Sequence, residues 1–353
     1  MLKARKCVRE MREYHSPLSA PATELRLDMN ENTTGCSPRV LAKIRSLDAK
    51  LLALYPRREY GERLVADFLG INPSEAMLTN GADEGIDLLC RAYLDNNDEL
   101  VLVVPTFGMY EVFSQGSAAK VARVAAGPEF GFPVDKVVDA ITPRTRMIII
   151  CNPNNPTGTV IERADILRVL EAATDAAVLV DEAYFEFYGK SMMDQIGKVP
   201  NLFIARTFSK VYGLAGMRVG YAVAPPDMAQ QLAHNRMSIG VSLLSLKAAL
   251  AALDDADHVR LSIKRNADDR QEFLNDTNVR MGSCIDTHTN FILLKADHPV
   301  DEITQHFRKN NVLIGYNLAL GENKYVRISF GRPEEMKEFW RLWDLLPHSG
   351  MNH

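Results

Sequence analysis

The sequence lacks the cysteine and histidine patterns by which disulfide frameworks and metal centres are recognised. Its five cysteines are scattered along the chain without a CxxC pair, which argues against both a structural zinc site and a disulfide framework. The eight histidines include no HxxxH pair, so we expect no catalytic metal. Scattered free cysteines are typical of a reducing compartment, and we predict a cytoplasmic protein.

Long apolar runs, an excess of positive charge and a dinucleotide-binding fingerprint are also missing. No stretch approaches the roughly 18 apolar residues of a membrane span, and the first residues lack the apolar core of a signal peptide. The net charge of −4 gives no reason to expect nucleic acid binding, and we interpret the basic opening at residues 3–12 as a solvated run. No G-x-G-x-x-G follows a predicted strand, which argues against a nicotinamide-dependent dehydrogenase. We therefore expect neither a membrane nor a nucleic acid as partner.

The middle of the chain alternates short apolar runs with helical stretches. The runs lack the polar alternation of a sheet with one wet face, so they predict strands that are covered on both sides. This order predicts an α/β domain with a largely parallel sheet between helices. The predicted strands are Glu99–Val104, Thr145–Cys151, Ala176–Asp181 and Leu202–Ala205, with helices such as Ala82–Leu94 and Ile161–Ala173 between them.

The last third of the chain has a different pattern, which indicates a smaller second domain. With 353 residues and about 150 residues per domain as the usual size, two domains are expected. We predict an N-terminal arm at residues 1–37, a large domain at 38–236 and a small α+β domain at 237–353. The small domain would contain helices at Leu243–Leu253 and Val259–Phe273 and strands at Thr289–Lys295, Val312–Gly315 and Tyr325–Phe330.

Polar clusters follow three of the predicted strands, at the edge where open α/β sheets bind ligands. In one cluster, Lys210 lies beside hydroxyl side chains and is followed by Arg218. A lysine can condense with a carbonyl cofactor when its amine is partly deprotonated, and hydroxyls with a guanidinium suit a phosphate. Asp181 ends another strand, where its carboxylate could keep a pyridine nitrogen protonated, and Tyr184 could donate to a phenolate oxygen.

Two further segments offer donors for the same kind of ligand. Asn155 belongs to the turn Asn152–Gly158 and presents an amide at the sheet edge. The segment Asn80–Glu84 opens a predicted helix, whose first N–H groups suit an anion. Taken alone, each of these segments has a structural alternative, namely a surface loop, a helix cap, a turn or an ordinary helix start.

Taken together, the segments resemble a known family. NPTG, DEAY and SK occur in that order, with an arginine eight residues after the lysine. This order is similar to that of the fold-type I, aspartate-aminotransferase-like superfamily, and in particular to histidinol-phosphate aminotransferases and their aromatic aminotransferase relatives. The resemblance extends from about Leu27 to about Gly331. It implies a mostly parallel seven-stranded sheet, pyridoxal 5′-phosphate (PLP) as cofactor, and transfer of an amino group between an amino acid and a 2-oxo acid.

The resemblance also implies a role for each matching residue around the cofactor. Lys210 would carry PLP as a Schiff base and act as general base, and Asp181 would pair with the pyridine nitrogen. Asn155 and Tyr184 would bind the phenolate oxygen, and Phe107 would stack on the ring. The phosphate ligands would be the backbone at Ala82 and Asp83 and the side chains of Thr207, Ser209 and Arg218.

Other matching positions extend the implied site toward the substrate and a partner subunit. Arg327 would bind the substrate α-carboxylate beside Asn155, a bidentate task that suits a guanidinium. Tyr14 would belong to an arm that folds over the substrate, or would anchor that arm to the body of the protein. Tyr55 resembles the tyrosine that reaches the phosphate in the partner subunit's site. This similarity implies a homodimer, with the arm packed on the small domain and the partner.

One departure from the family pattern bears on the substrate. Histidinol-phosphate enzymes carry a second arginine at the position that aligns with Gly315. Loss of one guanidinium should weaken a phosphorylated substrate by about 1.5–3 kcal/mol, so we expect a free amino acid with an aromatic or other large side chain rather than histidinol phosphate. The motifs leave a PLP-dependent decarboxylase of the threonine-phosphate type, or an oxidase, as alternatives. The short arm and negative net charge disfavour a non-enzymatic regulator.

Overall fold

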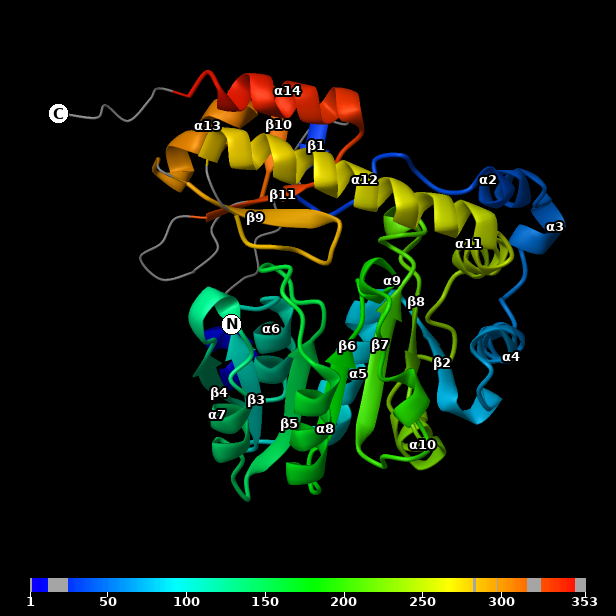
Figure 1. The fold of residues 1–353 in the computed structure, drawn as a ribbon. Coiled ribbons are helices and arrows are strands. Elements are labelled where there is room, and N and C mark those ends of the chain that lie inside the picture. Colours follow the sequence, from blue (N-terminus) through cyan, green and yellow to red (C-terminus); the bar gives the residue numbers. More distant parts are fainter. Residues whose placement is uncertain (1, 12–24, 282–283, 297, 316–324, 347–353) are drawn as a thin grey trace.

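A seven-stranded sheet forms the centre of the computed structural model, which describes residues 2–11, 25–281, 284–296, 298–315 and 325–346 (Figure 1). The strand order is β2-β8-β7-β6-β5-β3-β4, and β8 alone runs antiparallel to its neighbours. This arrangement confirms the predicted α/β fold with a largely parallel sheet. The strands are β2 (Ala76–Thr79), β3 (Glu99–Val104), β4 (Lys120–Ala125), β5 (Thr145–Cys151), β6 (Ala177–Asp181), β7 (Leu202–Thr207) and β8 (Gly220–Val223).

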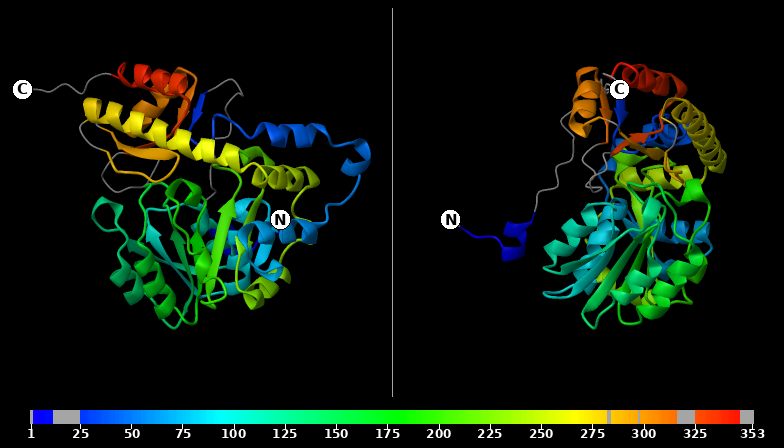
Figure 2. Two further views of the ribbon diagram at one scale, coloured as in Figure 1. Left: turned by 45° about the vertical axis from the view of Figure 1, so that its right-hand side comes forward. Right: turned by 60° about the vertical axis from the view of Figure 1, so that its left-hand side comes forward.

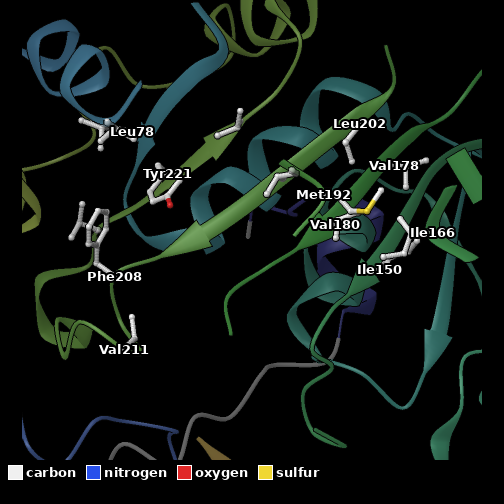
Figure 3. Packing of buried hydrophobic residues seen from close by; sticks show 14 of the residues in the cluster. Leu78, Ile150, Ile166, Val178, Val180, Met192, Leu202, Phe208, Val211 and Tyr221 are labelled. Atoms are coloured by element: carbon white, nitrogen blue, oxygen red, sulfur yellow. The ribbon is translucent and has the colours of Figure 1, made fainter. Parts of the chain in front are cut away.

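Both faces of the inner strands are buried, because successive side chains point to opposite faces and both sets are apolar, whereas the edge strand β4 is largely exposed. Along β5, Ile150 packs in one apolar cluster and Ile149 packs in the other. Figure 3 shows part of the first cluster, which includes Ile150, Val180 of β6 and Ile166 of α8. Helices α4 (Arg58–Leu69), α7 (Val134–Asp139), α8 (Arg163–Ala172) and α11 (Leu243–Leu253) contribute to this cluster. The second cluster takes residues from α5 (Gly81–Tyr93), α6 (Met109–Gly116) and α10 (Pro226–Ala233).

A third apolar cluster, separate from the two on the central sheet, lies among the C-terminal elements, where Phe273, Phe307 and Phe339 are fully buried. Strand β9 (Phe291–Lys295) pairs antiparallel with β11 (Tyr325–Ser329), and β10 (Val312–Ile314) pairs parallel with β1 (Leu25–Leu27). Helices α12 (Ala256–Met281), α13 (Val300–Lys309) and α14 (Pro333–Trp343) accompany these strands. Figures 1 and 2 show α12 running from this C-terminal unit to α11 beside the central sheet.

The boundaries of the predicted elements agree closely with the structure, apart from a few ends. Strands β3 and β5 and helix α11 begin and end at the predicted residues. Helix α12 is longer than predicted, because its ends carry polar residues that continue the helix without the apolar periodicity on which the prediction rested. In the described part of the chain, no helix is long and apolar enough to cross a membrane. The remaining short helices are α1 (Lys6–Glu10), α2 (Pro38–Arg45), α3 (Ala49–Leu52) and α9 (Phe185–Tyr188).

Candidate active site

A cavity of about 470 Å³ lies at the carboxyl ends of β5, β6 and β7. This is the edge at which open α/β sheets bind ligands, and it is where the sequence places its polar clusters. Eleven of the residues that we predicted for the site line this one cavity. They are Ala82, Asp83, Phe107, Asn155, Asp181, Tyr184, Thr207, Ser209, Lys210, Arg218 and Arg327.

The amine of Lys210 faces both the cavity and the chain segment that follows β1. Its Nζ donates to the backbone carbonyl of Met29 at 3.1 Å and lies 5.5 Å from the centre of the Tyr184 ring. Burial lowers the pKa of Lys210 to about 8, and the positive charge of Arg327 acts in the same direction. A sizeable fraction of this amine is therefore neutral near neutral pH, as a nucleophile or a general base requires.

Asp181 lies at the base of the cavity, at the end of β6, with 4% of its surface exposed. Burial raises the pKa of this carboxyl to about 6, although two donors favour the charged form. The Tyr110 hydroxyl donates to Oδ2 at 2.6 Å, and the Ala183 N–H donates to Oδ1 at 3.0 Å. Sequence reasoning missed Tyr110, which belongs to α6 and packs edge-on against Phe107 at 5.5 Å between ring centres.

Another part of the cavity gathers groups that suit an anion. Helix α5 begins there, and its first N–H groups have no acceptor within the helix. Thr207 Oγ1 donates to Ser209 Oγ at 2.9 Å, and Arg218 donates to Ser209 at 3.5 Å and to Asp83 at 3.0 Å. Gly220 lets β8 approach the start of α5, since a Cβ there would lie 2.7–2.8 Å from the backbone of Gly81 and Ala82. The approach brings a helix N-terminus, two hydroxyls and a guanidinium to one place.

On the side of the C-terminal unit, Arg327 of β11 reaches into the cavity. Its Nη1 donates to Asn155 Oδ1 at 2.6 Å, and its Nη2 donates to the carbonyl of Asp28. Gly315 pairs directly with Arg327, each N–H donating to the other's carbonyl at 2.9 and 3.0 Å. Side chains of such a pair project from the same face of a sheet, so position 315 lies beside the arginine side chain. A Cβ at Gly315 would lie 3.2 Å from Arg327 Nε.

Two predicted residues are not placed in the cavity, and several unpredicted ones are. Tyr55 is 82% exposed and does not line the cavity of its own chain, while Tyr14 lies outside the described residues. Sequence reasoning missed Met29 and Asn30, which line the cavity together with Tyr110. Both come from the segment 27–35 that contributed to the resemblance, and this was the available signal.

Comparisons with known proteins agree with this arrangement. The family model described as aminotransferase class I and II matches residues 22–341. A histidinol-phosphate aminotransferase of Carboxydothermus hydrogenoformans is 35% identical over 325 residues, which cover 89% of this chain and 88% of that protein. A putative histidinol-phosphate aminotransferase of Erwinia carotovora atroseptica superposes with a TM-score of 0.85 at 28% identity, over 91% of this chain and 94% of that one.

A further solved structure carries the cofactor that the motifs imply. The histidinol-phosphate aminotransferase of Sinorhizobium meliloti, in complex with pyridoxal 5′-phosphate, superposes with a TM-score of 0.89. It is 22% identical, and the match covers 98% of this chain and 97% of that one. At this identity the likeness supports the fold, and the family follows from the sequence matches. The chain belongs to the class I and II aminotransferases and is a PLP-dependent aminotransferase.

Proposed function

We propose that the cavity holds PLP and transfers the amino group of a free α-amino acid to a 2-oxo acid. The observation that carries this proposal is the meeting of three groups in one cavity, namely the amine of Lys210, the carboxylate of Asp181 and the guanidinium of Arg327. The first suits a carbonyl cofactor, the second a pyridine nitrogen and the third a substrate carboxylate.

The residues present fit PLP in size and charge. The cavity volume of about 470 Å³ falls within the range of small-molecule sites. Among the residues that the structure describes, the buried carboxylate of Asp181 forms hydrogen bonds but no ion pair, and a protonated pyridine nitrogen would supply the missing positive charge. The start of α5, with Thr207, Ser209 and Arg218, would hold the phosphate, and Phe107 would cover the ring.

When bound, PLP supplies an aldehyde that condenses with amines and a ring that withdraws electrons from the substrate's α-carbon. The protein's own groups hold and move protons. Lys210 Nζ, with its pKa lowered to about 8, would take the α-proton from the substrate and return it. Asp181 would keep the ring nitrogen protonated, while Asn155 and Tyr184 would hydrogen-bond the ring oxygen.

The substrate proposal rests on the pair formed by Gly315 and Arg327. Because position 315 projects beside Arg327, an arginine there would place a second guanidinium next to the first. Glycine supplies no such charge, and it lets the two strands lie close, since a Cβ would lie 2.9 Å from the Arg327 carbonyl oxygen. A single guanidinium with the Asn155 amide matches one α-carboxylate. The absence of a second positive charge supports a substrate with a weakly polar side chain.

The visible spectrum of the holoenzyme tests this proposal. Each of a panel of amino acids, and histidinol phosphate, is added in turn, and a 2-oxo acid follows. Loss of the cofactor band that the 2-oxo acid restores marks transamination, whereas release of carbon dioxide or peroxide would assign the site to a decarboxylase or an oxidase. A higher kcat/KM for histidinol phosphate than for every free amino acid would contradict the substrate assignment.

Gly315 also provides a matched pair of variants. Gly315→Arg should raise kcat/KM for histidinol phosphate relative to the best amino acid by about 10- to 150-fold, the equivalent of one hydrogen bond to a charged group. Gly315→Ala fills the same space without charge and should give no such gain. An equal effect of both variants would show that volume, and not the guanidinium, decides the preference.

We also propose a homodimer in which Tyr55 reaches the partner subunit's site. Tyr55 lies in an exposed apolar surface whose members come from α2, α3, α4, α11 and the segment after α3, and α11 packs against α2 and α4. Large apolar side chains exposed together on neighbouring helices are typical of an interaction surface. Light scattering should give a mass of twice that of one chain. Leu54→Glu places a charge on the surface, so it should reduce the measured mass to that of one chain and weaken PLP binding. The exposed members are Leu41, Leu51, Leu52, Leu54, Tyr55, Tyr60, Phe68 and Leu244.

The division into an arm at residues 1–37, a large domain at 38–236 and a small domain at 237–353 belongs to the same proposal. The pairing of β1 with β10 supports packing of the arm on the small domain. Helix α1 contacts α6 beside the central sheet, so different parts of the arm would contact both domains. Limited proteolysis of the holoenzyme should cut near residue 236 if this boundary is accessible.

A further inference from the structure

Three consecutive residues after β1, here called loop 28–30, contact three groups of the site. The carbonyl of Asp28 accepts from Arg327, and the carbonyl of Met29 accepts from Lys210 Nζ. The side chain of Asn30 donates from Nδ2 to the Tyr184 hydroxyl at 2.9 Å. Loop 28–30 therefore touches the groups assigned to the substrate carboxylate, to proton transfer and to the ring oxygen. Its first two contacts use the backbone, and Asn30 alone of the three acts through its side chain.

The Asn30 amide is buried and has a hydrogen-bond partner on each side. Asn30 is 2% exposed, and its backbone N–H donates to Ser329 Oγ at 2.9 Å. Because this hydroxyl oxygen already accepts, its own hydrogen is available for Asn30 Oδ1, which lies 3.3 Å away. In the structure the oxygen of the amide faces Ser329, and its nitrogen faces Tyr184. Asn290 Nδ2 donates to the Asn30 carbonyl at 3.0 Å and anchors the residue from the start of β9.

This orientation decides where the Tyr184 hydrogen points. An amide nitrogen donates two hydrogens and offers no acceptor, so the Tyr184 hydroxyl can only accept from it. The hydroxyl must direct its own hydrogen elsewhere, and Tyr184 lines the cavity. Burial raises the pKa of Tyr184, so this hydrogen stays in place over the working pH range. The Tyr184 hydroxyl can thus donate its hydrogen only in a direction away from Asn30.

We propose that Asn30 is a positioning residue, which aims the Tyr184 hydrogen at the ring oxygen of the bound cofactor. This inference rests on the proposed function, in which Tyr184 binds that oxygen. Asn30 does not need to touch the cofactor itself, since it acts through the hydroxyl of Tyr184. Ser329 of β11 contacts the Asn30 amide, and Asn290, just before β9, holds the Asn30 backbone. The direction of the hydroxyl therefore depends on how the C-terminal unit sits over the central sheet.

A donor at the ring oxygen has a measurable consequence. It withdraws electron density from that oxygen and makes the neighbouring nitrogen, through which Lys210 is joined to the cofactor, less basic. Loss or misdirection of the donor should therefore raise the pKa at which the visible band of the holoenzyme titrates. One hydrogen bond to a charged group corresponds to about one to two pKa units, which sets the shift expected for Tyr184→Phe.

Asn30→Gly is the cleanest variant, because the backbone of Asn30 is left-handed, with φ of 55°. Glycine adopts this conformation without strain, so the backbone contacts to Ser329 and Asn290 can remain while the amide is removed. We expect the spectral pKa to rise by about half a unit to one unit, less than for Tyr184→Phe. Asn30→Asp keeps the shape but turns the donor into an acceptor that competes for the Tyr184 hydrogen, so it should shift the pKa further.

Two controls distinguish an effect of Asn30 on the direction of the Tyr184 hydrogen from an effect on the stability of the fold. In a Tyr184→Phe background, Asn30→Gly should give no additional shift, because its effect passes through the missing hydroxyl. Asn32 provides the matched control: it lies two residues away, donates to the carbonyl of Val211 at 3.1 Å and does not line the cavity. Asn32→Ala should leave the spectral pKa unchanged even if it lowers the melting temperature.

The outcomes distinguish this inference from the proposal on which it rests. If wild type forms no visible band with PLP, the site assignment fails, and the inference fails with it. If wild type and Tyr184→Phe titrate as expected but Asn30→Gly and Asn30→Asp titrate like wild type, the site stands and the role of Asn30 is refuted. A shift of equal size in the Tyr184→Phe background would also refute it, since Asn30 would then act directly.

Discussion

Replacement of Asp181 by asparagine should stabilise the cofactor-free protein at neutral pH while it weakens the cofactor site. The carboxyl of Asp181 is buried without an ion pair among the described residues, and burial raises its pKa from 3.8 to about 6. In the folded state it therefore binds a proton more tightly than in the unfolded chain. Stability must fall as the pH rises through this window, because the unfolded state releases the proton first.

The size of the effect follows from the pKa change. About two pKa units at roughly 1.36 kcal/mol each give a destabilisation of wild type of about 3 kcal/mol. This destabilisation is absent below pH 4 and fully present above pH 6. Asparagine has no such titration. The difference in unfolding free energy between variant and wild type should thus move in favour of Asp181→Asn by about 3 kcal/mol between pH 4 and pH 7.

Calorimetric or urea unfolding of the cofactor-free proteins across this pH range measures the difference. The change with pH is the decisive quantity, because any difference between the neutral carboxyl and the asparagine amide in their contacts to Tyr110 and Ala183 adds an offset that does not vary with pH. Tyr110→Phe should raise the pKa of Asp181 further, since it removes a donor that favours the charged carboxylate. The stability of this variant relative to wild type should therefore fall as the pH rises. A pH-independent difference between Asp181→Asn and wild type would refute the reasoning. Bound PLP should abolish the advantage of the variant, because the ring nitrogen pairs with the carboxylate.

Three further predictions follow from the geometry of the cavity. Lys210→Ala should abolish the visible band and reduce transamination by at least about 10³-fold, because the covalent anchor and the general base are lost together. Absorbance spectra and stopped assays of transamination measure the two effects. The rate at which wild type captures PLP should rise with pH through about 8, where the Lys210 amine becomes neutral; Arg327→Met should move this rise to higher pH, because the positive charge that lowers the pKa is gone. Gly220→Ala should destabilise the fold by about 3 kcal/mol and weaken phosphate binding, whereas Gly116→Ala, with nothing within 4 Å of its Cβ and outside the cavity lining, should do neither, as unfolding curves and PLP titration would report.

Four strands of the central sheet, β3, β5, β6 and β7, could be predicted because burial on both faces leaves an apolar run, whereas the short strands β2 and β8 and the largely exposed edge strand β4 were not predicted. The run at Thr145–Cys151 begins and ends where β5 does, since turn-forming residues bound it. The site motifs were predictable for a related reason. Parallel strands bring their carboxyl ends to one edge, so Asp181 and Thr207 had to lie near each other once their strands were recognised.

Strand β1 and the residues after it could not be predicted in this way. β1 has three residues, and it is a strand because β10 pairs with it far along the chain. Tyr110 reaches Asp181 across 71 positions, and Asn30 reaches Tyr184 across 154. Such contacts leave no local periodicity, because they depend on how separate units pack against each other.

The residues that sequence reasoning found and missed therefore differ in kind. Lys210, Asp181 and Arg327 carry charges that a cofactor and a substrate require. Asp181 and Lys210 are visible in the residue type and in the strand end that each one terminates or follows, and Arg327, in the middle of β11, was found through the family resemblance. Asn30 and Tyr110 act on other side chains, each through one hydrogen bond, to Tyr184 and to Asp181 respectively. A hydrogen bond to a buried carboxylate or a blocked hydroxyl direction can shift a pKa by a unit or more, the same order as a contact to the ligand itself. Substitution of these positioning residues should thus change the pH dependence of the site before it changes the fold.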